Sequence, residues 1–125
     1  MEAHHDNLTY LEEPYLIKDL PLKFNKEIIN YTAALPKHIQ AVEAHFLVFL
    51  HTGGGNKDAL FRICIKDTQG PCRKWVMGHG YGQNAWSYNS ETISMPVNTA
   101  RELEISLDNK QTGHAGLKVY LVAFR

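Results

Sequence analysis

Alternation of apolar and polar residues constrains the fold of this chain more than any other feature of its sequence. In residues 102–108, three apolar side chains alternate with Glu and Ser. Successive side chains of a strand point to opposite faces, so this pattern predicts a strand with one buried and one wet face. Similar alternation occurs in residues 59–66, 92–97 and 117–124. We therefore expect an all-β protein.

Turn signals separate these segments at intervals of about ten residues, which is typical of a sandwich or barrel. They are rich in Gly, Asn, Asp and Pro and comprise residues 52–56, 67–71, 78–90, 98–99 and 108–116. A chain of 125 residues fits one domain. We predict that residues 1–125 form a single antiparallel β-sandwich, jelly-roll-like, with about eight short strands.

The N-terminal third has a weaker pattern. Residues 1–13 carry four acidic side chains and no Lys or Arg, and we expect a flexible acidic segment without a signal peptide. Residues 20–25 and 28–34 are candidate strands. Pro14, Pro21 and Pro36 would lie at strand ends or on edges. The compartment stays unknown, although we expect extracellular action.

Residues 42–50 are apolar on both faces. Phe46 and Val48 belong to one face, whereas Leu47 and Phe49 belong to the other. Two apolar faces predict a central strand that is covered on both sides. The cover for the second face is either the N-terminal segment or another subunit.

The charge balance argues against two classes of partner. Lys plus Arg number 13 and Asp plus Glu number 13, which gives no formal net charge. A nucleic-acid-binding protein needs a basic face to displace counterions. No apolar run is long enough to span a bilayer. We expect neither a nucleic-acid partner nor insertion into a membrane.

The two cysteines, Cys64 and Cys72, lie on either side of the turn sequence 67–71. In a hairpin they would face each other and form a disulfide. Two free thiols are the alternative, because the sequence does not fix the register.

No group of residues in the sequence has the spacing that a catalytic or metal-binding site requires. His45 and His51 share a strand face but lie about 20 Å apart, too far to hold one metal. Glu102 and Glu104 also share a face, as a glycosidase pair would, yet we interpret them as the wet face of their strand. Neither cysteine has a local sequence that supports a nucleophile. We expect no enzyme, no cofactor and no metal site.

Residues 78–90 stand apart as a long predicted loop, and long loops in compact domains are often functional. Aromatic rings and amides suit a sugar, which presents C–H faces and hydroxyl edges. The alternative is that Trp86 and Tyr88, at strand spacing, face the core. The candidate ligand-binding residues are His79, Tyr81, Gln83, Asn84, Trp86, Tyr88 and Asn89.

Three stretches carry a resemblance, namely residues 81–90, 93–97 and 118–124. Over the span 81–124, about a third of the chain, the sequence thereby resembles small β-sandwich domains of invertebrate extracellular proteins and fibre-like receptor-binding heads. The resemblance implies a recognition or assembly domain that is often oligomeric.

Three functional hypotheses follow. The first is a carbohydrate-binding, lectin-like recognition or adhesion domain that binds a glycan or glycoprotein and gains avidity as a homo-oligomer. The second is a structural, assembly or cell-adhesion module in which outward apolar residues pack between subunits. Those residues are Leu47, Phe49, Tyr120, Val122 and Phe124. The third is an enzyme with a dispersed site.

Overall fold

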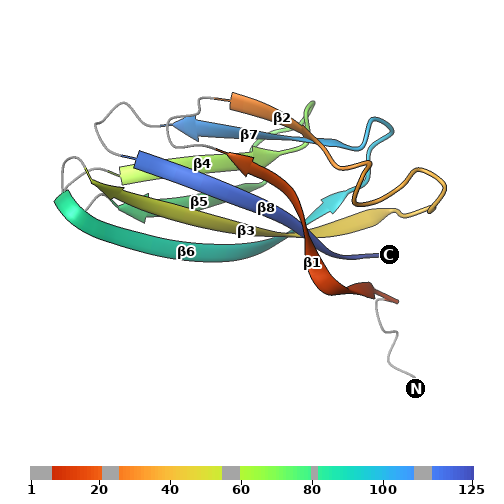
Figure 1. Ribbon diagram of the computed structural model, residues 1–125. Coiled ribbons are helices and arrows are strands. Elements are labelled where there is room, and N and C mark those ends of the chain that lie inside the picture. The colour runs from red at the N-terminus through yellow and green to blue at the C-terminus, as the bar shows by residue number, and fades with distance from the viewer. Residues whose placement is uncertain (1–6, 21–25, 55–59, 80–81, 109–113) are drawn as a thin grey trace, which may run out of the picture.

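The protein is all-β, as predicted. The computed structural model describes residues 7–20, 26–54, 60–79, 82–108 and 114–125. No helix long and apolar enough to cross a membrane occurs within these ranges. The eight strands (Figure 1) are β1 (Thr9–Leu20), β2 (Lys26–Asn30), β3 (Glu43–Gly54), β4 (Leu60–Lys66), β5 (Lys74–His79), β6 (Gly82–Pro96), β7 (Glu102–Asp108) and β8 (His114–Phe124).

The strands form two antiparallel sheets of four, which confirms the predicted β-sandwich (Figure 1). Sheet A has the order β1-β8-β3-β6, and sheet B has the order β2-β7-β4-β5. This interleaved order is that of a jelly roll, an eight-stranded double sheet. The strands of sheet A are longer than predicted, with 11 to 15 residues each.

Strand β3 is central in sheet A and pairs with β6 on one side and β8 on the other. Its inward residues form part of the core and are 1 % exposed or less: Ala44, Phe46, Val48 and Leu50. Leu47 and Phe49 lie on the outer face, as the two-faced pattern predicted. Strand β1 extends the sheet beside β8 and does not pair with β3.

The N-terminal strands differ from the prediction. Strand β1 begins at Thr9, within the segment expected to be flexible, and Pro14 falls where its pairing with β8 changes register. An edge strand tolerates proline because its outer N–H groups need no partner in the sheet. Strand β2 ends at Asn30, whose side-chain oxygen accepts a hydrogen bond from the Thr32 N–H at 2.9 Å. This Asx turn ends the strand four residues earlier than predicted.

The predicted loop 78–90 is instead mostly strand. Strand β5 ends at His79, and β6 begins at Gly82. Strand β6 pairs with β3 along nearly its whole length, with Asn89 opposite Leu50 and Tyr88 opposite His51. Ladder pairing of this length overrides the turn preference of Gly and Asn.

The two sheets are tied together along the edge formed by β5 and β6. The Arg73 Nε donates a hydrogen bond to the Ser94 carbonyl at 2.9 Å. The Asn89 amide donates one to the Met77 carbonyl at 3.0 Å. Lys74 and Glu91 add an ion pair at 3.4 Å. Side chains from each sheet thus engage the backbone of the other sheet at this edge.

Gly78 allows β5 to approach β3 closely. A Cβ at this position would lie 2.9 Å from Thr52 Cγ2 and 3.2 Å from Leu50 Cδ2. Because these atoms belong to buried side chains, a side chain at residue 78 would push the sheets apart.

A disulfide joins Cys64 of β4 to Cys72, which lies just before β5, and their Cα atoms are 5.7 Å apart. It encloses the turn in which the Gly70 N–H donates to the Asp67 carbonyl at 3.0 Å. Of the two arrangements open from the sequence, the structure has the bonded one.

The expectation that Glu104 lies on a solvent-exposed face of β7 is wrong. This residue is only 7 % exposed, and its carboxylate lies 3.5 Å from Lys26 Nζ and 3.3 Å from Lys66 Nζ. Strand β7 lies between β2 and β4, so lysines from both neighbours cover the carboxylate. The residue is an ion-paired part of the sheet B surface.

Candidate functional site

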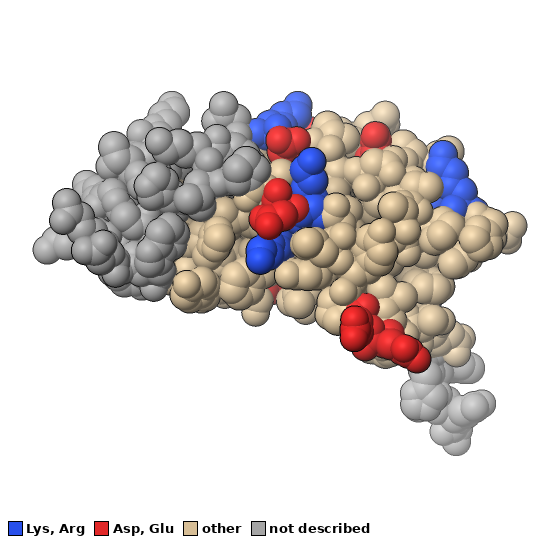
Figure 2. Space-filling view, in the orientation of Figure 1, with Lys and Arg blue, Asp and Glu red and all other residues tan. Residues whose placement is uncertain are grey.

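The outer face of sheet A is the first candidate surface. Cross-strand register aligns Leu16, Tyr120 and Leu47 in one row. Phe49 lies in the next row of this face, and Tyr88 lies in the row after it, opposite His51. We call these five residues, without His51, the apolar face. Figure 2, in which β1 and β8 lie in front, shows basic and acidic side chains together near the centre of this side and mostly uncharged residues to the right of them. Tyr88 is 64 % exposed and Leu16 is 46 % exposed.

A groove of about 560 Å³ crosses the apolar face. Its floor and walls include Leu47, Phe49 and Tyr120, and β1 contributes Pro14 and Glu13. Lys118 completes the lining. The groove therefore combines an apolar floor with one acidic and one basic side chain.

An aromatic cluster borders the groove on the β6 side. The ring centroids of Phe49 and Tyr88 are 5.8 Å apart, and those of His51 and Tyr88 are 6.5 Å apart. A Cβ at Gly116 would overlap the His51 imidazole, so the glycine leaves room for this ring to lie across β8. The cluster is fixed by packing on three strands.

A polar group lies at the start of β3. Arg125 Nη2 is 3.1 Å from Glu43 Oε2, and His45 contacts the same carboxylate. The hydrogen bonds from Arg125 and His45 lower the pKa of Glu43 below its usual value. The group therefore ties the start of β3 to the residue that follows β8.

The predicted ligand-binding residues do not form one site. Tyr88 is exposed on the apolar face, whereas the Asn89 amide crosses to the Met77 carbonyl of sheet B. Consecutive strand residues point to opposite faces, so the two cannot contact one ligand together. Tyr81 lies outside the described residues. For four further residues the structure describes the strand position but not the side chain: His79, Gln83, Asn84 and Trp86.

The end of β8 also differs from the expected outward pattern. The pairing of β8 with β3 shifts between Leu121 and Ala123, so Val122 forms a bulge. A one-residue shift exchanges the two faces. Phe124, which was expected on the outer face, packs partly buried against the core.

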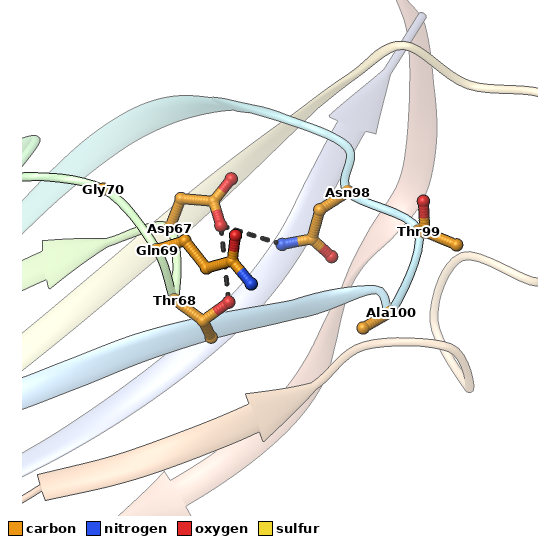
Figure 3. A pocket seen from close by; sticks show the side chains of 7 residues that line it. All are labelled: Asp67, Thr68, Gln69, Gly70, Asn98, Thr99 and Ala100. Carbon is orange, nitrogen blue, oxygen red and sulfur yellow. Dashed lines mark hydrogen bonds between the residues drawn. The ribbon is translucent and has the colours of Figure 1, made fainter.

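A second candidate site lies between two loops at one end of the sandwich, and the sequence had indicated only turns there. This polar pocket of about 430 Å³ is lined by Asp67, Thr68, Gln69, Gly70, Asn98, Thr99 and Ala100 (Figure 3). The Asn98 amide donates to Asp67 Oδ1 at 3.2 Å and to the Glu102 carbonyl at 2.6 Å. Its oxygen accepts the Glu102 N–H at 2.9 Å. Asn98 is thus engaged in holding its own turn.

Tyr31 lies beneath the same turn and is 1 % exposed. Burial raises the pKa of its phenol, while a hydrogen bond from the Asn98 backbone and the positive charge of Arg101 act in the opposite direction.

In the part of the chain that the structure describes, no group of three or more His, Cys, Asp or Glu gathers in a way that would hold a metal.

Comparisons with known proteins give only distant structural likenesses. No protein-family model matches the chain, and no curated protein matches it. The coat protein of Tobacco streak virus superposes with a TM-score of 0.48 at 10 % identity, covering 98 % of this chain and 88 % of that one. A dimer structure of that coat protein gives 0.45 at 8 % identity, with 96 % and 88 % covered. These values are too low to bear on function.

Proposed function

We propose that this protein is a non-enzymatic assembly module whose apolar face packs against a second copy of the chain. The observation that carries the proposal is the apolar face itself. It lies at the centre of sheet A, where β3 and β8 have neighbours on both sides. Exposed apolar surface that is contiguous in this way marks interaction sites in soluble proteins.

The rim charges of the groove favour a second copy as the occupant. In a two-fold interface both subunits contribute the same patch. Where one residue of the first subunit contacts a different residue of the second, the same contact therefore occurs again with the two subunits exchanged. Glu13 and Lys118 line one groove and have opposite charges. In a two-fold pair, Glu13 of each copy can therefore face Lys118 of the other copy. A stable interface needs about 800 Å² per partner, roughly a tenth of the 7594 Å² surface.

The first test is the oligomeric state measured by sedimentation or light scattering over a concentration series. The wild-type protein is expected to dimerise. Phe49→Asp is expected to weaken the dimer by about 100-fold, because an unpaired charge would be buried at the centre of the contact. Val42→Asp, which adds the same charge at a 71 % exposed position before β3, is the matched control. A wild-type protein that stays monomeric at the highest concentration overturns the proposal.

The second test exchanges the rim charges. Glu13→Lys and Lys118→Glu should each weaken the dimer by about tenfold, and the double variant should recover wild-type affinity. Recovery in the double variant would support the two-fold arrangement. If neither single variant weakens a dimer that Phe49→Asp abolishes, the apolar face is the interface and the proposed pairing of the charges is wrong.

Glycan recognition is a second candidate, supported by the exposed ring of Tyr88. Its position beside His51 offers a flat apolar surface next to a polar ring, which suits a sugar face. A glycan array of the wild-type protein should give binding that Tyr88→Ala abolishes and Tyr10→Ala, at another exposed tyrosine, leaves unchanged. An array without any bound glycan, with folded protein, would exclude this candidate.

A further inference from the structure

Arg101 is the most unusual residue outside the surfaces described above. It is 6 % exposed and lies in the tight turn between Asn98 and the start of β7, where its N–H donates to the Asn98 carbonyl at 3.1 Å. Its φ is 57°, in the left-handed region that non-glycine residues rarely adopt. Such a conformation persists only where the surroundings impose it, and it is common at functional sites.

The guanidinium group of Arg101 is only partly satisfied. Its Nη2 donates to the Ile39 carbonyl at 2.8 Å, with longer contacts to the carbonyls of Pro36 at 3.4 Å and Lys37 at 3.5 Å. Its Nη1 is buried and has no hydrogen-bond partner among the described residues. A buried charge and a buried unpaired donor both cost free energy unless a partner compensates them. An anion would supply both kinds of compensation.

A pocket of about 330 Å³ adjoins Arg101. It is lined by Lys37, Ala41, Val97, Asn98, Thr99 and Arg101. Two of these residues are cations, and none is acidic. Lys37 is exposed, and Figure 3 shows the Thr99 side chain directed away from Asp67 on the neighbouring loop. The pocket therefore offers positive charge and a hydroxyl group.

We propose that this pocket binds a small oxyanion, a phosphate or carboxylate group, independently of self-assembly. Lys37 attracts the anion at the mouth of the pocket, and Arg101 provides the charge at its base. The guanidinium fork matches the spacing of oxygens in either group, and the Thr99 hydroxyl adds one donor. Because Nη1 is enclosed, a small displacement of the lining side chains accompanies binding and gives this donor its partner.

The test is a titration of the wild-type protein with inorganic phosphate at constant ionic strength, followed by NMR chemical shifts. Saturable shifts at residues 37–41 and 97–101 are expected, together with a melting temperature that rises with phosphate concentration. Sodium chloride at the same ionic strength controls for screening and should give neither effect. A parallel titration with acetate distinguishes a carboxylate site from a phosphate site. Absence of saturable shifts with both anions overturns the proposal.

Two variants distinguish a specific anion-binding site from nonspecific attraction of anions to positive charge. Lys37→Gln is expected to weaken binding about tenfold, the value of one charge-assisted hydrogen bond. Lys18→Gln removes an exposed lysine of β1 and should leave binding unchanged. Equal weakening by both variants would mean nonspecific attraction and would contradict the site. Arg101→Lys keeps the charge but loses the fork, so a folded variant should bind the anion at least tenfold more weakly.

Discussion

Replacing Phe46 by alanine is expected to lower the free energy of unfolding by about 3–5 kcal/mol. The Phe46 side chain is fully buried between the sheets, and its ring meets that of Tyr31 edge-on at 5.1 Å. Removing the ring loses the transfer free energy and this aromatic contact, and it leaves a cavity that the rigid sheets cannot close. Domains of this size have a total stability of about 5–15 kcal/mol, so the variant should unfold readily. Chemical denaturation measures the difference.

Phe49→Ala is the matched control, because Phe49 lies three residues along the same strand on the opposite face. Its side chain is half-buried, and the change should cost about 1 kcal/mol or less in stability of the monomer. The two phenylalanines are thus expected to separate folding from assembly. Equal losses of stability at both positions would contradict the assignment of the two faces of β3.

Loss of the Cys64–Cys72 disulfide is expected to cost about 2–3 kcal/mol. The bond closes a loop with a sequence separation of eight residues, and the cost follows from the extra freedom of the unfolded chain. Cys72→Ser is the better substitution, because Cys72 is more exposed than Cys64. Denaturation with and without a reductant measures the effect.

The reductant provides the control for the disulfide prediction. It should destabilise the wild-type protein to the level of Cys72→Ser and should leave the variant unchanged. A wild-type protein with the same stability under oxidising and reducing conditions would show that the bond contributes nothing to the fold.

The sheet pattern was readable from the sequence because burial is periodic in a half-buried strand. Phe46 alternates with Leu47, and Phe61 alternates with Arg62, just as the structure places them. The jelly-roll class followed from the number and spacing of such segments. Strand β1 was missed because Pro14 and a change of register interrupt its alternation.

The candidate site was harder to predict, because long-range pairing decides it. Tyr88 and Asn89 were grouped by proximity in the chain, yet strand geometry sends them to opposite faces of β6. The Val122 bulge moved Phe124 inward, and periodicity alone cannot locate a bulge. Arg101 gave no local signal, since its pocket depends on carbonyls more than 60 residues away in the chain.

The ties along β5 and β6 have a consequence for fibre formation. A continuous ribbon of strands grows only if every molecule offers two open edges, one for each neighbour. In this protein, Arg73 and Asn89 cross between the sheets at one edge. Each bond occupies a backbone carbonyl of an edge strand, Ser94 of β6 and Met77 of β5, so a strand added there would have to displace it. The cross-sheet hydrogen bonds therefore disfavour strand addition at this edge, which limits the growth of a continuous ribbon.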